Sequence, residues 1–358
     1  MRKGSIEAPL LDISRGARQF ALTEMGLSRE ERNMAECVNW GILGAAKFAR
    51  QFMGPAIHAA EGARLDALAT SSPEKVAPFQ AFCPDLTVHE SYEALLADPS
   101  IDAVYIPLPN HMHVEWSLKA LDAGKHVLCE KPITLQADEF DALLAKRDET
   151  GLLAAEAYMI VHHPQWQLVK SLIADGAIGK LVHVTGAFSF DNRADTGNIR
   201  NKAETGGGGL RDIGVYVIGS TRFVTGQEPV DVQSRIRWEN GVDAFTEINA
   251  QFPDFTYSAY VSIRAHLYQE MCFHGEAGVI RLTAPFNARV FGEARVEIHK
   301  QGHEVVTHRF PSEDHYKLQV EAFSRSIREN LAYPCPLEFS KGTQAMIDRV
   351  FDGAATIS

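Results

Sequence analysis

Between residues 37 and 157, short apolar runs alternate with segments of helical periodicity. The apolar runs have strand length and stand at 37–44, 63–71, 101–109, 125–132 and 152–158. The helical patterns stand at 46–60, 72–82, 91–98, 113–124 and 137–151. Strands that alternate with helices of this length are joined by right-handed crossovers, which makes neighbouring strands parallel. This part of the chain therefore predicts an α/β unit with a doubly wound parallel sheet.

After residue 157 the pattern changes to longer strands with alternating polar and apolar positions. A helix at 165–179 precedes a strand, a glycine-rich segment and another helix. Alternating segments then stand at 231–239, 244–252, 256–264, 269–275, 278–284 and 295–301, before an amphipathic helix at 318–330. Alternation with period two is typical of an antiparallel sheet with one covered face. We expect an α+β unit with a large, mostly antiparallel open sheet.

Residues 1–36 differ from both units because they are polar and mixed in charge, with a possible short helix at 28–35. We interpret them as an N-terminal extension. The first domain is then expected over 37–157 and the second over 158–358. No linker rich in proline or serine separates these two, so we expect them to pack closely.

The composition argues against a nucleic-acid-binding protein and against a membrane-spanning protein. The chain has 358 residues, 45% of them hydrophobic and 23% charged, with a net charge of −11. An acidic chain is a poor partner for nucleic acid, and no apolar run approaches the ~20 residues of a membrane helix. Five cysteines without a CxxC pair favour a reducing compartment. The extension lacks the apolar core of a secretion signal, so we expect a cytoplasmic protein.

The first candidate site is the strand-turn-helix at Gly41–Ala49. Gly44-x-Ala46-x-x-Ala49 is a variant of the glycine fingerprint of dinucleotide-binding (Rossmann) domains, in which a tight turn brings the backbone close to a pyrophosphate. The free N–H groups of the following helix favour phosphate. A plain strand-helix turn is the alternative interpretation. The candidate cofactor residues here are Gly41, Gly44, Ala45, Ala46, Lys47 and Phe48.

The end of the second strand bears on the choice of dinucleotide. NAD sites usually carry a carboxylate there, but Asp66 falls in mid-strand and the strand ends in Thr70 and Ser71, with Lys75 beyond. Hydroxyls and a lysine suit a 2′-phosphate, so we predict NADP, with NAD possible. A capping serine with a solvated lysine is the alternative.

Polar segments also follow the third and fourth apolar runs, at the strand ends where open α/β sheets bind ligands. Lys131 comes directly after a buried run and before a proline, which argues against a solvated surface lysine. His111 and His113 lack further ligands at a metal-binding spacing, so no metal is expected. The candidate cofactor residues in these segments are Pro107, Leu108, Pro109, Asn110, His113, Glu130 and Lys131.

Taken together, these motifs resemble the glucose–fructose oxidoreductase, inositol dehydrogenase and MocA family. The resemblance rests on WGILGAAKFA, on VYIPLPNHMHVEWSLKALDAGKHVLCEKP and on GGGGLRDIGVY, and it extends over roughly 38–350. The most similar branch contains glucose–fructose oxidoreductase and NADP-dependent xylose and dihydrodiol dehydrogenases. The resemblance implies a Rossmann domain followed by an open-sheet domain, and a homo-oligomer, dimer or tetramer, formed through that sheet.

The resemblance also implies three catalytic residues. Lys131 matches the family's catalytic lysine, Asp212 its second-domain acid, and Tyr216 its acid/base residue. Gly206–Gly209 would supply a close backbone approach at the start of their helix. Asp212 and Tyr216 are four residues apart and so share a helix face. A tyrosine is a poor base at its usual pKa of ~10, and we expect the Lys131 ammonium to lower the pKa of Tyr216.

The chain departs from the family pattern at two places. Val161 stands where an arginine often follows the EAYM-like strand, and His162, Arg193 and Arg200 are candidate substitutes for binding substrate. Ser71 stands where NADP-dependent members carry an arginine.

The resulting prediction is hydride transfer between NADP(H) and the carbinol or carbonyl carbon of a sugar, polyol or related molecule. Two alternatives remain. One is an enzyme like glucose–fructose oxidoreductase, with a cofactor that does not dissociate, and the extension motivates it. The other is a non-catalytic nucleotide-sensing regulator, like the galactose-regulon repressor.

Overall fold

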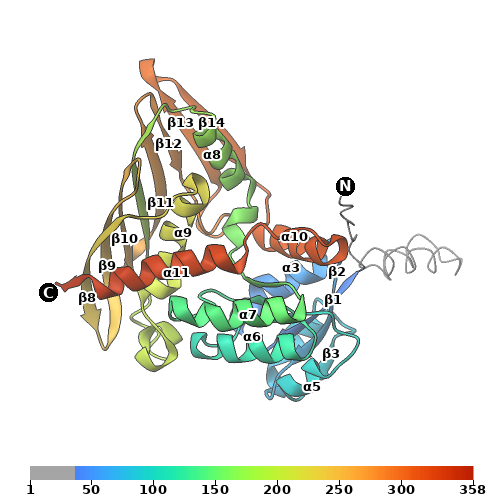
Figure 1. The fold of residues 1–358 in the computed structure, drawn as a ribbon. Helices are drawn as coiled ribbons and strands as arrows, with labels where there is room; N and C mark the ends of the chain where they lie inside the picture. The colour runs from blue at the N-terminus through green and yellow to red at the C-terminus, as the bar shows by residue number, and fades with distance from the viewer. Residues whose placement is uncertain (1–36, 358) are drawn as a thin grey trace, which may run out of the picture.

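The computed structural model describes residues 37–357, which form two β-sheets with helices around and between them (Figure 1). The first sheet has six parallel strands in the order β3-β2-β1-β4-β5-β6. These strands are β1 (Val38–Leu43), β2 (Ala63–Ala69), β3 (Thr87–His89), β4 (Ala103–Ile106), β5 (His126–Cys129) and β6 (Ala154–Glu156). The order reverses between β1 and β4, which opens a crevice at their carboxyl ends.

Helices separate the strands as the alternating pattern predicts. They are α3 (Gly54–Ala59), α4 (Ala77–Gln80), α5 (Tyr92–Leu96), α6 (His113–Asp122) and α7 (Phe140–Thr150). The segment Ala49–Met53 before α3 is a π-helix. The central strands β4 and β5 are almost entirely buried, which explains their continuous apolar sequence. The edge strand β3 is mostly exposed and carries no apolar run, so the sequence pattern missed it.

The second sheet has nine strands in the order β14-β13-β12-β11-β7-β10-β9-β8-β15. They are β7 (Leu181–Asp191), β8 (Asp231–Glu239), β9 (Val242–Gln251), β10 (Thr256–Ser262), β11 (Arg264–Gly275), β12 (Gly278–Leu282), β13 (Ala294–Lys300), β14 (Val305–Phe310) and β15 (Ala354–Thr356). All pairs are antiparallel except β7 with β10 and β8 with β15. The predicted fold class, α/β followed by α+β with a mostly antiparallel sheet, is confirmed.

Four helices accompany the second sheet: α8 (Pro164–Ala174), α9 (Val215–Thr225), α10 (His315–Glu329) and α11 (Leu337–Asp352). The sequence pattern did not predict α11, which contains Gly342 near its middle. A Cβ at Gly342 would lie 2.1 Å from a guanidinium nitrogen of Arg222. The glycine that weakens the helical pattern is therefore required by the close approach of α9.

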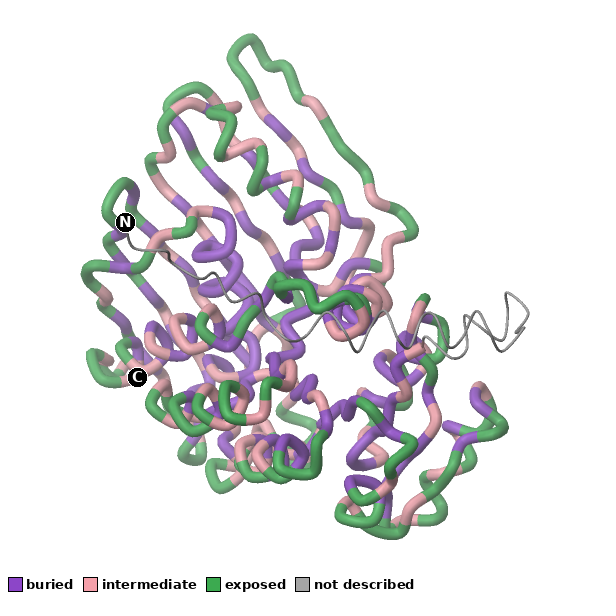
Figure 2. The backbone as a smooth tube through the Cα atoms, turned by 45° about the vertical axis from the view of Figure 1, so that its right-hand side comes forward, coloured by how far each residue is buried: buried purple, intermediate pink, exposed green. Residues whose placement is uncertain are grey.

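The last two helices connect the two sheets. On α10, the ring of Phe323 lies 5.2 Å from that of Trp40 in β1, and Trp40 Nε1 donates to Ser324 Oγ at 3.2 Å. On α11, Gln344 Nε2 donates to the Leu135 carbonyl at 3.1 Å. In Figure 1, α11 lies between the second sheet and α7, and it contacts both. The buried positions run continuously from one sheet to the other (Figure 2).

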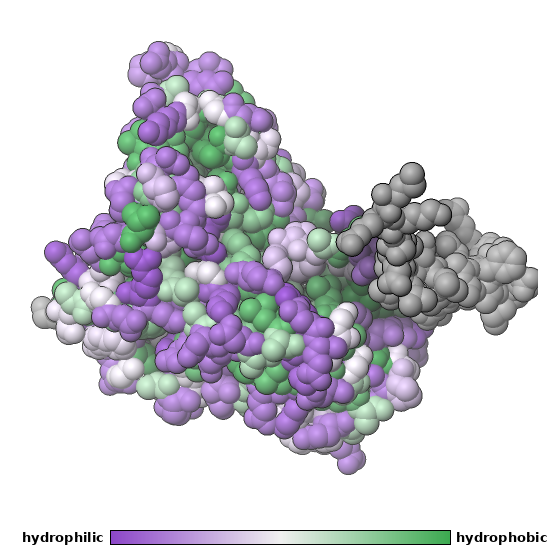
Figure 3. Space-filling view, viewed as in Figure 1, coloured by the Kyte–Doolittle hydropathy of each residue, from purple (hydrophilic) through white to green (hydrophobic). Residues whose placement is uncertain are grey.

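Hydrophilic side chains cover much of the face shown in Figure 3, and hydrophobic ones gather in smaller patches. No helix within residues 37–357 is long and apolar enough to cross a membrane. The predicted extension 1–36 and its helix at 28–35 lie outside the described residues.

Candidate active site

A cavity of about 690 Å³ lies between the carboxyl ends of β1, β4 and β5 and the second sheet. The first sheet contributes Ala46, Lys47, Phe48, Gln51, Pro107, Leu108, Asn110, His113, Glu130 and Lys131 to its wall. The second unit contributes residues of β7, of the segment 195–200, of the helix start at 212–216, and of β11, α10 and the loop before β13. The cavity thus brings both units to one place.

The turn after β1 is tight and closely packed. Gly44 has a φ of +105°, and a Cβ there would lie 2.9 Å from the Leu108 side chain. The Gly44 N–H donates to the Ala69 carbonyl at 2.9 Å, which fixes the turn against β2. Ala46, Lys47 and Phe48 follow on the cavity wall, and their role as cofactor contacts stays a prediction.

Two residues predicted at this turn have other positions. Gly41 lies inside β1, where a Cβ would meet the Leu95 side chain at 2.7 Å, so it serves packing against α5. Ala45 is half-buried and packs against the main core, and it is not on the cavity wall.

The end of β2 keeps its polar residues at the same edge of the sheet but outside the cavity wall. Thr70 is buried, and its Oγ1 accepts from the Ser72 N–H at 3.1 Å. Ser71 and Lys75 are exposed. Asp66 lies in mid-strand, as predicted, and pairs with Arg64 at 2.7 Å. No carboxylate of β2 therefore stands at the strand end.

The loop after β4 is fixed by two side chains. Asn110 Nδ2 donates to the Gly206 carbonyl at 3.1 Å, which joins the two units across the cavity. The buried ring of His113 lies with Nδ1 2.8 Å from the Pro132 carbonyl and Nε2 2.7 Å from the Leu108 carbonyl. Burial lowers the pKa of His113, and these carbonyl contacts oppose it. His113 thus connects the loops after β4 and β5. Pro109 is not on the cavity wall.

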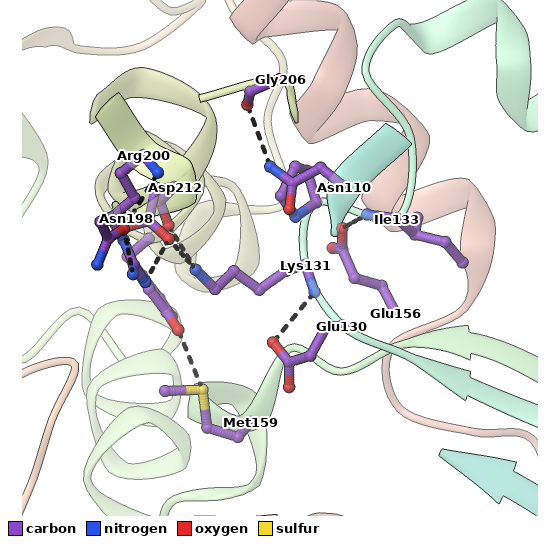
Figure 4. Close-up of polar contacts among 12 residues, drawn as sticks. Asn110, Glu130, Lys131, Ile133, Glu156, Met159, Asn198, Arg200, Gly206 and Asp212 are labelled. Carbon is purple, nitrogen blue, oxygen red and sulfur yellow. Dashed lines mark hydrogen bonds and ion pairs between the residues drawn. The ribbon is translucent and has the colours of Figure 1, made fainter. Parts of the chain in front are cut away.

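The loop after β5 carries Glu130 and Lys131 (Figure 4). Tyr105 Oη donates to Glu130 Oε1 at 2.6 Å. Burial raises the pKa of Glu130, and Lys131 acts in the opposite direction. Lys131 Nζ reaches across to the second unit, where it donates to Asp212 Oδ1 at 2.8 Å and to the Asp212 carbonyl at 2.7 Å. The predicted lysine and carboxylate therefore form a direct ion pair.

Asp212 lies on a short π-helix, Leu210–Gly214, that leads into α9. It also pairs with Arg200, whose Nε lies 2.5 Å from Oδ2 and whose Nη2 lies 3.1 Å from Oδ1. Burial alone would raise the pKa of Asp212, but Arg200 and Lys131 together hold it well below its usual range. Asp212 is therefore an ionised carboxylate between two cations.

A glycine-rich turn precedes this helix, and Asp243 of β9 fixes it. Asp243 Oδ2 accepts from the Leu210 N–H at 2.5 Å. A Cβ at Gly208, whose φ is +112°, would lie only 1.9 Å from Asp243 Oδ1. Burial raises the pKa of Asp243 to about 7. The predicted close backbone approach at this turn is made to a carboxylate of the second sheet.

Tyr216 lies on the cavity wall, but its electrostatic environment differs from the prediction. Its hydroxyl donates to Met159 Sδ at 3.6 Å. Lys131 Nζ lies over the ring of Tyr216, 5.2 Å from the centroid. Burial raises the pKa of Tyr216 well above its usual value. The expected net lowering of this pKa is therefore wrong, because burial is the dominant effect on the phenol.

The three candidate substrate residues have different locations. Arg200 lines the cavity, half-exposed beside Asp212. Arg193 is exposed and pairs with Asp191 at 2.6 Å, away from the wall. His162 Nε2 lies 2.9 Å from Tyr333 Oη, and burial lowers the pKa of His162 to about 3. His162 and Arg193 therefore lie outside the cavity, which corrects their prediction as substrate residues.

The structure adds cavity residues that sequence reasoning missed. Phe188 and Phe190 point to one side of β7 with the strand period of two, a signal that was available. Asn287 and Tyr316 come from a loop and a helix start far along the chain. No local pattern marks them, because Tyr316 reaches the cavity through the docking of α10 on the first unit and Asn287 through contacts with Gln269 of β11.

Two family models match the chain. The oxidoreductase family with an NAD-binding Rossmann fold matches residues 38–158, and the GFO/IDH/MocA C-terminal domain matches residues 166–281. The chain belongs to the GFO/IDH/MocA family. The family prediction is thereby confirmed. Among residues 37–357 of this GFO/IDH/MocA protein, no group of three His, Cys, Asp or Glu side chains could hold a metal ion.

Curated relatives in the GFO/IDH/MocA family span nearly the whole chain. A dTDP-3,4-didehydro-2,6-dideoxy-α-D-glucose 3-reductase of Saccharopolyspora spinosa is 34% identical, over 88% of this chain and 95% of the relative. A D-xylose 1-dehydrogenase (NADP(+)) of Haloferax volcanii is 31% identical, over 88% and 97%. The crystal structure of a 3-ketoreductase from Actinomadura kijaniata, in complex with NADP and TDP-benzene, is similar with a TM-score of 0.82. It is 28% identical and covers 90% of this chain and 99% of that one.

Proposed function

We propose that this protein is an NADP(H)-dependent oxidoreductase that transfers hydride between the cofactor and the carbinol or carbonyl carbon of a sugar or related molecule. One observation carries the proposal. The cavity joins the dinucleotide turn at Ala46–Phe48 to Lys131, Asp212 and Tyr216. The similar xylose dehydrogenase and ketoreductase, which act with NADP or bind it, support the choice of cofactor and substrate class.

The cofactor would supply or accept the hydride, and the residues of the chain would manage the proton. In the reductive direction, Tyr216 would donate its hydroxyl proton to the developing alkoxide of the substrate. A raised pKa keeps this proton on the phenol until a strong base forms beside it. In the oxidative direction the same residue would accept the proton, because the reverse reaction passes through the same transition state.

Lys131 would bind the reacting oxygen. An ammonium group has three N–H donors, and the two contacts with Asp212 leave one for a ligand. Because Lys131 is fixed at Asp212, this donor is held in place before the substrate arrives. Arg200 holds the other side of Asp212 and keeps part of its guanidinium exposed to the cavity, where it would bind a substrate hydroxyl or phosphate.

The remaining cofactor contacts follow from position. The turn at Gly44–Phe48 would hold the pyrophosphate, because the positive φ of Gly44 makes the turn tight and the backbone N–H groups at the following helix start favour phosphate. Thr70, Ser71 and Lys75 stand at the strand end where the 2′-phosphate of NADP would lie. The loops at 107–110 and 130–131 would border the nicotinamide.

The expected homo-oligomer through the second sheet stays a prediction, which light scattering of the purified protein would test.

The test is turnover by the purified protein, with NADP+ and NAD+ run separately against a panel of aldoses and polyols, and with NADPH against keto-sugars. We expect turnover with NADP(H) and a lower rate with NAD(H). Turnover with NAD(H) alone would contradict the assignment of the β2 end. Absence of turnover in both directions, in protein shown to bind added NADPH by fluorescence, would refute the proposed function.

A further inference from the structure

The segment Ala284–Asn287, between β12 and β13, reaches the cavity without regular secondary structure. Buried polar side chains fix its backbone from α8: Trp166 Nε1 donates to the Pro285 carbonyl at 2.8 Å, and Gln165 Nε2 to the Ala284 carbonyl at 3.2 Å. The ring of Phe286 lies 5.5 Å from that of Tyr216. This segment therefore forms part of the site wall and packs on the candidate proton donor.

Gln269 of β11 holds the far end of this segment. Its side chain is buried, and its Oε1 accepts from the backbone N–H groups of Phe286 at 3.3 Å and Asn287 at 3.1 Å. A backbone N–H is a donor only, so the group that faces it must be the amide oxygen. The orientation of the Gln269 amide is thus fixed by chemistry. Its Nε2 must point the other way, where it lies 2.7 Å from Asn287 Oδ1.

The same reasoning fixes Asn287. Its Oδ1 accepts from Gln269, so its Nδ2 is directed away from that contact, on a side chain that lines the cavity. The Asn287 amide also hydrogen-bonds Tyr316, and that bond lowers the pKa of Tyr316 against the dominant effect of burial. An amide nitrogen carries two hydrogens, so one remains for a ligand.

We propose that Asn287 donates this hydrogen bond to an oxygen of the bound sugar, and that Gln269 is the positioning residue that makes Asn287 a donor rather than an acceptor. The inference rests on the proposed function and deepens it. A keto or ring oxygen accepts hydrogen bonds but cannot donate them. A wall that presents a fixed donor at this point therefore selects a sugar with such an oxygen and rejects an analogue without it.

The substitution Gln269→Glu tests the polarity with almost no change in shape. A protonated carboxyl at this position still accepts from the two backbone N–H groups and donates its O–H to Asn287, as the amide does. An ionised carboxylate has no donor, so Asn287 must turn its N–H toward it and present Oδ1 to the sugar. The hydrogen-bond donor that Asn287 presents to the cavity then becomes an acceptor. Because glutamine does not ionise, this change depends on pH only in the Gln269→Glu variant.

The experiment compares wild type, Gln269→Glu, Asn287→Ala and the double variant at pH 6 and pH 9, with the sugar of the panel that turns over best. We expect KM for the sugar in Gln269→Glu to be near the wild-type value at pH 6 and roughly tenfold higher at pH 9. Asn287→Ala should show the increase at both pH values, and the double variant should equal Asn287→Ala. Gln301→Glu, the same change at an exposed site, should match wild type.

Three outcomes would overturn the inference: an unchanged KM in both single variants, effects that add in the double variant, or an increase confined to the KM for NADP(H). The last outcome would place the Asn287 contact on the cofactor.

Thermal unfolding of the apo protein gives a readout that does not depend on turnover. The difference in Tm between wild type and Gln269→Glu should widen from pH 6 to pH 9, and a constant difference would refute the anchoring role. A wild-type protein without turnover would instead count against the proposed function.

Discussion

The substitution Tyr216→Phe separates the chemical role of the tyrosine from its structural role. Among residues 37–357, the hydroxyl has one hydrogen-bond partner, the thioether of Met159 at 3.6 Å. The ring packs against Tyr158, Phe188 and Phe286. Phenylalanine keeps the ring contacts and loses only a weak bond to sulfur. The free energy of unfolding should therefore change by less than about 1 kcal/mol.

The rate should change far more. If Tyr216 donates the proton, its removal should lower kcat for carbonyl reduction by roughly 10²- to 10⁴-fold, the usual size of general-acid catalysis. That corresponds to about 3–5 kcal/mol of activation free energy. KM for NADPH should stay within about threefold. Because burial raises the pKa of Tyr216, the wild-type reductive rate should show no loss from tyrosine ionisation between pH 7 and pH 10.

Tyr158→Phe is the matched control. The two tyrosine rings are stacked 5.8 Å apart, but Tyr158 Oη donates to the carbonyls of Val215 at 3.1 Å and Tyr216 at 3.2 Å, and it does not line the cavity. This variant should lose about 1 kcal/mol of stability and keep most of its activity. Chemical denaturation and steady-state kinetics on both variants decide the matter. A kcat for Tyr216→Phe within threefold of wild type would refute its role as the proton donor.

Three further predictions concern the ion-paired cluster and the cofactor. Lys131→Met should lower kcat by at least 10²-fold while the protein still binds NADPH in a fluorescence titration; normal turnover would exclude Lys131 from the reaction. Asp212→Asn should cost about 2 kcal/mol at pH 7. Because the pKa of Asp212 is lower in the folded than in the unfolded state, this cost should shrink as pH falls below about 4, and denaturant titrations at pH 7 and pH 3.5 would show it. Ser71→Asp should lower kcat/KM for NADP+ by roughly tenfold or more, because its charge repels the 2′-phosphate, and leave that for NAD+ nearly unchanged; an equal effect on both would move the phosphate site elsewhere.

The sequence was informative where function imposes a local pattern. The turn at Gly44 and the lysine after β5 each follow a buried parallel strand, so their positions at the carboxyl edge follow from the order of elements. The four-residue spacing of Asp212 and Tyr216 likewise places them on one side of a helix start.

The environments of the other site residues depend on contacts between elements far apart in the sequence, which no local pattern encodes. His162 is predicted to bind substrate because it follows Val161, which replaces a family arginine, but its ring contacts the hydroxyl of Tyr333 instead. The raised pKa of Tyr216 could not be predicted, because it depends on how deeply the packed fold buries the phenol. Asn287 was missed because its orientation depends on Gln269, a neighbour from another strand.

The position of α11 has a consequence for the mechanical coupling of the two units. This helix, residues 337–352, packs against both α7 and β8. Ala137 N–H donates to its Asp348 at 2.7 Å, and Arg222 of α9 fits against its Gly342. A hinge motion between the two units would therefore strain contacts on both sides of this one helix.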